Sequence, residues 1–179
     1  MLREEKAAGT ALGIEADRLT RNGSLVGDEI INSVVAAWLS KQSGDGFVFD
    51  GYPRTLGQAG VLDQMLAERK QPLDTVLLLE ADIATLRTRV ENRAFCKTCG
   101  NIVSIGLHIA DASASCPRCG GVLARRADDN AETLERRLCE YAEKTAPLIG
   151  YYEKRHLLQR VNTGRLPEQV FAEVCQILN

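Results

Sequence analysis

Long hydrophobic runs and a strong charge of either sign are both missing from this sequence of 179 residues. No stretch approaches the roughly 20 apolar residues that a membrane-spanning helix needs, and residues 1–5 lack the apolar core of a signal peptide. The formal net charge of −2 gives no overall attraction to nucleic acid or to anionic membranes. Internal repeats and low-complexity linkers are missing too. We therefore expect a globular protein without a nucleic-acid or membrane partner. Because four of its six cysteines form two close pairs without a secretory signal, we place it in the cytoplasm, and we expect it to be a monomer.

What the sequence does contain is an alternation of helical and strand patterns. Apolar runs predict three buried strands at residues 46–50, 75–79 and 157–161. Helical spacing predicts helices over residues 2–22, 28–39, 55–66, 81–93, from 129 onward and 167–178. Asp28, Thr55 and Asp129 stand where helix caps are expected, Asp129 with Glu132 at capping-box spacing. Strands that alternate with helices predict an α/β fold with a parallel sheet covered on both faces.

A cysteine-rich segment interrupts this alternation. Cys96 and Cys99 form one C-x-x-C pair, Cys116 and Cys119 form a second, and 16 residues separate the pairs. A glycine follows each pair, which permits the tight turn that aims two thiolates at one point. Four such thiolates form a closed tetrahedral zinc site of structural type. The alternatives are a reduced loop without metal or two redox pairs, and we expect the remaining thiols, Cys139 and Cys175, to be buried in helices.

A second motif follows the first apolar run. In Asp50-Gly51-Tyr52-Pro53-Arg54-Thr55, a carboxylate, a glycine and an arginine stand where open α/β sheets bind their ligands. Asp50 can hold a hydrated metal ion, Gly51 permits close approach to the backbone, and Arg54 offers a rigid fork of donors that suits phosphate.

Taken in order, the motifs resemble the zinc-lid form of bacterial adenylate kinases over the whole chain. The resemblance is carried by MLR at 1–3, GSLV at 23–26, DGYPRT with Gln58 at 50–58, RVENR at 89–93, the two cysteine pairs, RRADDNAETLERRL at 125–138 and PLIGYYEKR at 147–155. It implies a three-layer, P-loop-kinase-like parallel sheet with helices on both faces and an inserted zinc-ribbon lid. The implied divisions are 1–93 for the AMP-binding part and the first part of the core, 94–127 for the lid, and 128–179 for the rest of the core. The implied reaction is ATP + AMP ⇌ 2 ADP, with Mg²⁺ accompanying ATP and Zn²⁺ in the lid.

The same resemblance assigns residues to two nucleotide sites. It implies AMP binding by Arg3, Ser24, Leu25, Val26, Gly51, Tyr52, Pro53, Arg54, Gln58, Arg126 and Arg137. It implies ATP binding by Arg89, Arg93, Ile102, Val103 and Arg165, although Val103 replaces an aromatic residue. The catalytic group would comprise Arg54, Arg93, Arg126 and Arg137, which clamp the transferring phosphoryl group, and Asp50 near Mg²⁺.

One element of that family is not found. No G-x-x-x-x-G-K-[ST] string occurs, so the phosphate-cradling loop, its lysine and the preceding first strand have no counterpart. We therefore predict that the chain as written is a fragment or has a misplaced start, with a large loss of catalytic rate. The alternatives are a non-catalytic remnant that binds AMP or a protein partner, and another nucleoside monophosphate kinase. A zinc-ribbon nucleic-acid module is disfavoured by the acidic net charge.

Overall fold

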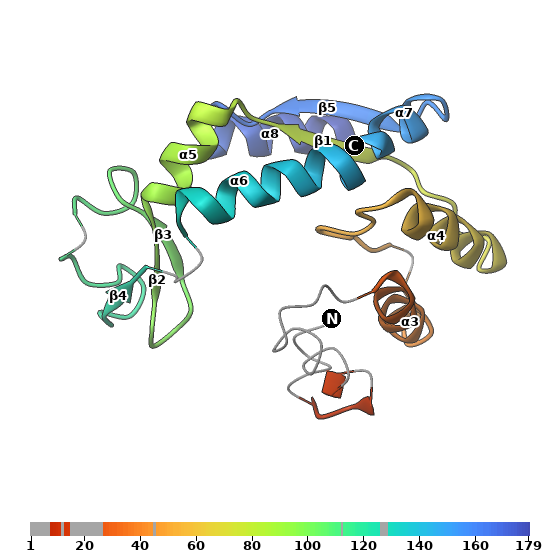
Figure 1. Cartoon of the computed structure of the whole chain (residues 1–179), viewed down its shortest axis with the longest axis horizontal. Helices are drawn as coiled ribbons and strands as arrows, with labels where there is room; N and C mark the ends of the chain where they lie inside the picture. Colours follow the sequence, from red (N-terminus) through yellow and green to blue (C-terminus); the bar gives the residue numbers. More distant parts are fainter. Residues whose placement is uncertain (1–7, 12, 15–26, 45, 112, 126–128) are drawn as a thin grey trace. The chain divides into compact units, whose positions relative to one another are not determined.

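The computed structural model describes residues 8–11, 13–14, 27–44, 46–111, 113–125 and 129–179 (Figure 1). Two compact units divide the chain. The first comprises Met1–Asp74 and Lys144–Leu157, and the second comprises Thr75–Glu143 and Leu158–Asn179. Among the described residues no helix combines the length and the apolar character that a membrane crossing requires.

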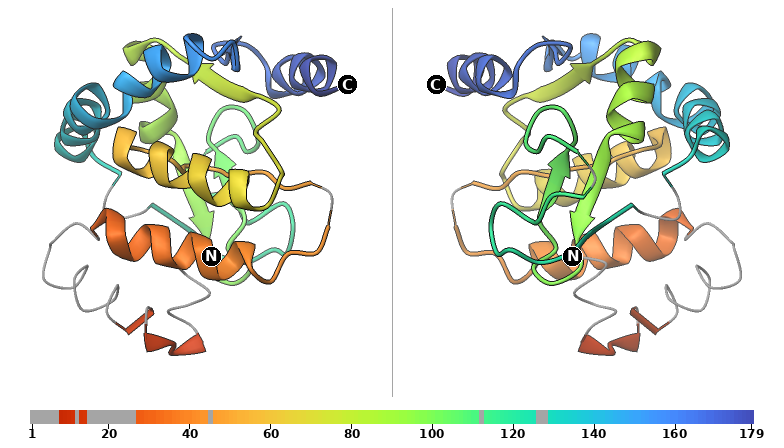
Figure 2. Two further views of the ribbon diagram at one scale, coloured as in Figure 1. Left: turned by 90° about the vertical axis from the view of Figure 1, so that its right-hand side faces the viewer. Right: turned by 90° about the vertical axis from the view of Figure 1, so that its left-hand side faces the viewer.

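The first unit is built on helices α3 (Asp28–Leu39), α4 (Leu56–Glu68) and α7 (Pro147–Glu153). Helix α4 begins after Thr55 because the Thr55 side chain accepts a hydrogen bond from the backbone N–H of Gln58, as predicted. Helices α3 and α4 lie side by side (Figure 2). Their buried faces, together with Tyr52 from the preceding turn, form a core that also contains Val35, Leu39, Leu62 and Leu66. Burial of this apolar surface stabilises the unit.

The predicted strand over residues 46–50 is wrong. Residues 46–49 have no regular secondary structure and pair with no strand among the described residues. The apolar run indicated burial on both faces, but only one side is covered. Phe47 and Phe49 pack against Trp38 with ring centroids 5.9 and 5.7 Å away, whereas Val48 is 87% exposed. An apolar pattern indicates which side chains pack in a core. It does not show whether a second strand lies beside the segment to form backbone hydrogen bonds with it.

The second unit contains a parallel strand pair, which confirms the α/β class. Strand β1 (Val76–Glu80) pairs with β5 (Leu158–Asn162) from Val76↔Leu158 to Glu80↔Asn162, and helix α8 (Pro167–Leu178) packs on β5 (Figure 1). Helix α5 (Ile83–Glu91) follows β1. A separate antiparallel sheet has the order β3-β2-β4, made of β2 (Arg93–Cys96), β3 (Ile102–Ser104) and β4 (Leu123–Ala124). The proposed division at residues 93 and 127 stays a prediction.

The long helical pattern after residue 129 divides into three segments. Helix α6 (Ala131–Glu140) is followed by a π-helical turn, η1 (Tyr141–Thr145), and then by α7. Pro147, the first residue of α7, cannot donate a backbone hydrogen bond, and the regular α-helical pattern is interrupted just before it. The cap of α6 is Asn130, whose side chain accepts from the N–H of Thr133. Asp129 is therefore not the cap, because its carboxylate pairs with Arg93.

Three further expectations need correction or cannot be assessed. The cap of α3 is Gly27 and not Asp28, whose carboxylate binds other side chains. Cys139 is exposed and Cys175 is half-buried, so the helical spacing did not identify a fully buried face. The predicted helix over residues 2–22 lies mostly outside the described residues.

Candidate functional site

The four predicted metal ligands converge on one point of the second unit. Their Sγ atoms all lie within 4.8 Å of one another. The Sγ atoms of Cys96 and Cys119 are 3.5 Å apart, and those of Cys99 and Cys116 are 3.8 Å apart. Each of these short distances joins a cysteine of one C-x-x-C turn, or knuckle, to a cysteine of the other. A tetrahedron with Zn–S bonds of about 2.3 Å has S···S edges of about 3.8 Å. The donor set and its spacing therefore fit a metal ion, and all four cysteines are free thiols.

The knuckle backbones explain why the thiols gather. Gly100 and Gly120 follow the two cysteine pairs with φ of +70° and +72°, a conformation that favours glycine. Their N–H groups donate to the carbonyl oxygens of Cys96 and Cys116, at 2.9 and 2.8 Å. Each chain reversal is thereby closed by a backbone hydrogen bond, which places both thiols of a pair on one side.

The pKa values of the cysteine thiols also favour binding of a cation among the four sulfur atoms. The backbone N–H of Cys99 is the main group that lowers the pKa of the Cys96 thiol, to about 6. The backbone N–H of Gly121 lowers the pKa of the Cys119 thiol, but the neighbouring thiols of Cys99 and Cys96 raise it. Together these effects raise the pKa of Cys119 to about 12. Thiolates this close repel one another, so all four can ionise together only when a positive ion lies among them.

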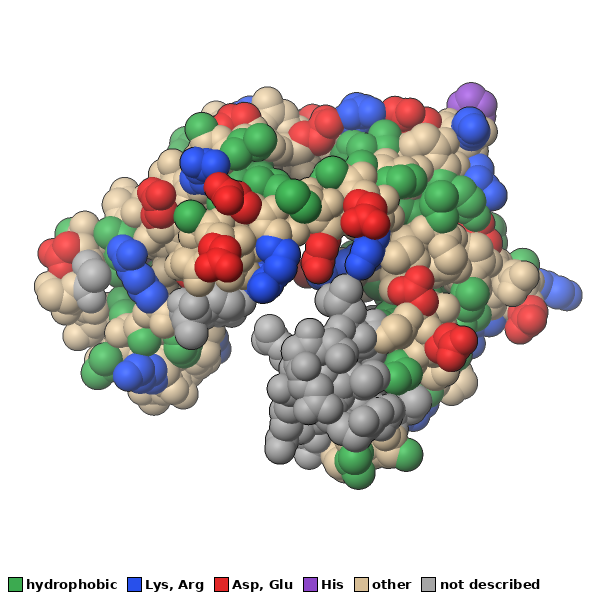
Figure 3. Space-filling model, in the orientation of Figure 1, with side chains coloured by type: hydrophobic (Ala, Val, Ile, Leu, Met, Phe, Trp, Pro, Cys, Tyr) green, Lys and Arg blue, Asp and Glu red, His purple; other side chains and the backbone are tan. Residues whose placement is uncertain are grey.

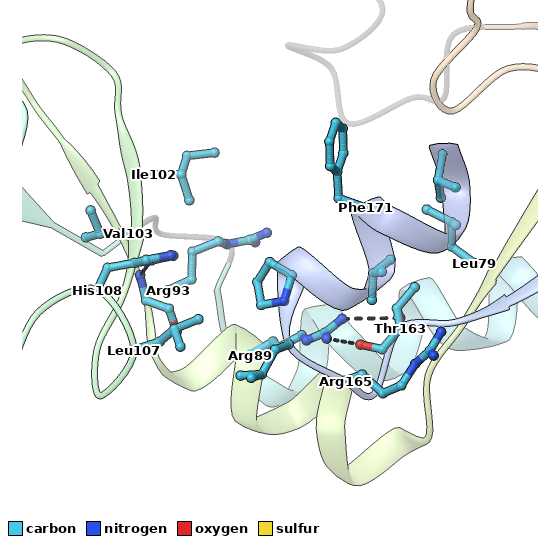
Figure 4. Close-up of a pocket in the computed structure, with 15 residues that line it drawn as sticks. Leu79, Arg89, Arg93, Ile102, Val103, Leu107, His108, Thr163, Arg165 and Phe171 are labelled. Atoms are coloured by element: carbon cyan, nitrogen blue, oxygen red, sulfur yellow. Dashed lines mark hydrogen bonds between the residues drawn. The ribbon is translucent and has the colours of Figure 1, made fainter. Parts of the chain in front are cut away.

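A second feature of the same unit is a pocket of about 560 Å³. All five residues that the resemblance assigns to ATP line it: Arg89, Arg93, Ile102, Val103 and Arg165. Figure 4 shows Ile102, Val103 and His108 on one side, Leu79 and Phe171 on the other, and the Arg93 side chain reaching between them. Val103 is buried, whereas Phe171 is 70% exposed. The pocket thus combines an apolar lining with three guanidinium groups.

Each arginine of the pocket is held by an oxygen of the protein. Arg89 donates to the backbone oxygen and the hydroxyl of Thr163 (Figure 4). Arg93 forms an ion pair with Asp129, whose side chain is only 1% exposed. Arg165 pairs with Glu173 and donates through Nε to the carbonyl of Asn162 at 3.1 Å. These contacts orient each guanidinium group, and a guanidinium is a planar set of N–H donors that suits an anionic ligand.

The turn at residues 50–55 in the first unit orients Arg54 through three bonds. Its Nε donates to the Gly51 carbonyl at 2.9 Å and its backbone N–H donates to Gln58 Oε1 at 2.7 Å. Its own carbonyl accepts from Thr145 Oγ1 at 2.9 Å. Gly51 has φ +71°, and a Cβ at that position would lie 3.0 Å from an Arg54 guanidinium nitrogen. The positive φ therefore favours glycine at this position, and the turn holds an exposed arginine beside the exposed Asp50.

Two other residues of this segment face the core. Tyr52 is buried and its hydroxyl donates to Asn32 Oδ1 at 2.8 Å. Burial, with the charge of Asp28, raises the pKa of Tyr52 to about 12. The Tyr52 side chain is thus a core group, and a ligand would meet this residue only through its backbone. Pro53 follows it through a cis peptide bond and is half-buried.

Gln58 is buried at 5% exposure, and both ends of its amide are engaged. Oε1 accepts from the N–H of Arg54, and Nε2 donates to Asp28 Oδ1, each at 2.7 Å. Sequence reasoning missed Asp28 as part of this site. The only available signal was a carboxylate near the start of a helix, and the chain gives no local hint of a partner 30 residues away.

Of the remaining predicted residues, only Arg137 lies within the described part of the chain. Arg137 lies exposed on α6 and does not line the pocket. Arg3, Ser24, Leu25, Val26 and Arg126 lie outside the described residues, so their assignments stay predictions.

Known proteins are similar to this chain over nearly its whole length. The adenylate kinase family model matches residues 1–157. An adenylate kinase of Magnetococcus marinus is 39% identical over 179 residues, which cover 99% of this chain and 84% of that protein. Adenylate kinases of Thermodesulfovibrio yellowstonii and Pseudothermotoga lettingae are 38% and 40% identical, again over 99% of this chain and over 83% and 82% of their own lengths. A match of this extent and identity shows that the chain belongs to the adenylate kinase family.

Proposed function

We propose that this chain is a nucleoside monophosphate kinase that transfers a phosphoryl group in the reaction ATP + AMP ⇌ 2 ADP. Its membership of the adenylate kinase family supports this reaction. One observation supports the assignment of the triphosphate end most strongly. Five residues spread from position 89 to position 165, chosen from the sequence for ATP, all line a single pocket. The other end of the reaction is assigned to the turn of the first unit, with Arg54 for the AMP phosphate and Gln58 for the base.

The arrangement suits phosphoryl transfer because that chemistry depends on alignment and on charge neutralisation. Arg89, Arg93 and Arg165 are fixed by protein oxygens, so they meet a polyphosphate without reorganising. An AMP phosphate is already nucleophilic at neutral pH, so no side chain has to act as a general base. Mg²⁺ brought with ATP would offset the charge of the phosphates, and we assign Asp50 to hold its water shell. Zn²⁺ is assigned to the four cysteines as a structural ion.

The wider setting also belongs to this proposal. We assign the protein to the cytoplasm as a monomer that binds nucleotides and neither nucleic acid nor membrane. Within each unit, the described basic and acidic side chains on the face shown in Figure 3 are interspersed and form no continuous field of positive charge. Nucleic-acid binding normally requires such a field, so the charge pattern supports a small-molecule substrate.

Binding and turnover test the proposal separately. Titration calorimetry with AMP should give a saturable site that Arg54→Met weakens at least about tenfold, because a charge-assisted contact to phosphate is lost. Arg69→Met is the control, since Arg69 bonds Gln71 and the Gln42 carbonyl away from this turn. A coupled assay of ADP formation then measures turnover, and a panel of monophosphates tests the substrate. Equal AMP affinity in the wild-type chain and Arg54→Met would contradict the site, and AMP binding without ADP formation would indicate a binding protein instead of a kinase.

A further inference from the structure

The Gln58 amide is part of a closed hydrogen-bond network that links α3, the turn at residues 50–55 and α4. Asp28 Oδ1 accepts from Gln58 Nε2 at 2.7 Å, and Asp28 Oδ2 accepts from Thr55 Oγ1 at 2.6 Å. The same Thr55 oxygen accepts from the backbone N–H of Gln58 at 3.1 Å. Because the whole network lies in the first unit, its geometry is independent of the second.

The chemistry of the two partners permits only one orientation of that amide. An ionised carboxylate is an acceptor only, so Asp28 must face the Gln58 NH₂ group. The backbone N–H of Arg54 is a donor only, so it must face Oε1. A rotation of the amide by 180° would set oxygen against the carboxylate and NH₂ against the N–H. Both bonds would be lost in a buried site, where unmet polar groups are costly.

A primary amide has two donors and two acceptor sites, so within the described residues these two bonds leave one N–H and one oxygen lone pair of Gln58 unused. A 6-aminopurine offers an amino donor at position 6 and an acceptor at N1, which match such a pair. A 6-oxopurine offers the reverse, an acceptor at position 6 and a donor at N1, and it would match the same amide only after a 180° rotation. The orientation of Gln58 therefore decides between these two classes of base.

We propose that Asp28 is a specificity-determining residue, which locks the Gln58 amide in the orientation that accepts 6-aminopurine monophosphates and rejects 6-oxopurine monophosphates. The inference rests on the proposed function, because it requires a purine monophosphate beside Gln58. Asp28 acts through Gln58 and needs no contact with the ligand.

AMP and IMP are a matched pair of probes, since both are purine ribonucleoside monophosphates and the donor and acceptor positions in question are reversed between them. Titration calorimetry on the full chain should show AMP binding at least about tenfold more tightly than IMP. Asp28→Asn can present either a donor or an acceptor to Gln58, so we expect the AMP-to-IMP affinity ratio to fall at least about fivefold. Glu29→Gln is the control, because it removes the same charge one residue further along α3 at an exposed position and should leave the ratio unchanged.

A measurement on the unmodified chain keeps the test valid if Asp28→Asn fails to fold. The side-chain NH₂ protons of Gln58 should exchange with water more slowly than those of Gln64, which lies exposed on the same helix. Equal exchange rates would overturn the inference. If the chain binds AMP but Asp28→Asn retains the wild-type ratio, the inference fails and the proposed function stands. If neither AMP nor IMP binds the wild-type chain, the proposed function itself fails.

Discussion

Gly121 offers a sharp test of the metal cluster. A Cβ built on this residue would lie 2.5 Å from Thr98 Oγ1 and 2.9 Å from Cys96 Sγ. Nonbonded heavy atoms normally approach no closer than about 3.5 Å, so in Gly121→Ala the sulfur or the backbone must retreat by roughly 0.6 Å. Zinc sites keep their bond lengths within about 0.2 Å, so the cluster has to deform elsewhere to keep its metal.

We expect this overpacking to cost about 1–3 kcal/mol, which lowers zinc affinity roughly 5- to 150-fold. Competition titration of the zinc-loaded protein against a colorimetric chelator measures the affinity directly. Gly60→Ala is the matched control, because a Cβ there meets nothing within 4 Å, and alanine in the interior of α4 should leave zinc binding unchanged. Wild-type zinc affinity in Gly121→Ala would refute the view that these four thiols form the metal site in this geometry.

Three further predictions concern the first unit, whose unfolding can be followed through the fluorescence of Trp38, the single tryptophan of the chain. Leu62→Ala should destabilise the unit by about 2–5 kcal/mol in urea titrations, because Leu62 is 1% exposed in the core, and a loss below 1 kcal/mol would contradict that packing. Tyr152→Phe should be neutral or stabilising by about 1 kcal/mol, since the buried Tyr152 hydroxyl has no hydrogen-bond partner among the described residues, and a clear destabilisation would reveal an unrecognised partner. Burial and the charge of Asp28 raise the pKa of Tyr52 from 10.0 to about 12, so the folded state keeps a proton that the unfolded chain loses above pH 10. This contribution to stability is complete below pH 10 and declines by at most about 1.4 kcal/mol per pH unit as the pH rises toward 12, and Tyr52→Phe should show a shallower decline over that range.

The clustering of the four cysteines was predictable from the sequence because each turn that forms it is local. Each C-x-x-C pair with its following glycine specifies one turn, and the positive φ of Gly100 and Gly120 is what that spacing requires. The start of α4 was predictable for the same reason, since Thr55 and Gln58 are three residues apart. The parallel strands β1 and β5 were also visible as apolar runs.

Expectations failed where a residue had more than one possible partner. Asp129 stood at capping-box spacing, yet Arg93 takes its carboxylate and Asn130 caps the helix. The apolar run at residues 47–49 indicated a strand, but whether a strand forms depends on a hydrogen-bonding neighbour distant in the sequence.

By itself, then, the sequence determined the family, the α/β class, the two cysteine knuckles and the arginines of the pocket, because ordered motifs and local turns carry that information. Only the tertiary structure decided that Asp28 holds Gln58 across 30 residues and which oxygens fix each arginine. Hydrogen bonds between distant segments depend on how helices and strands pack in space, and periodicity along the chain cannot record that packing.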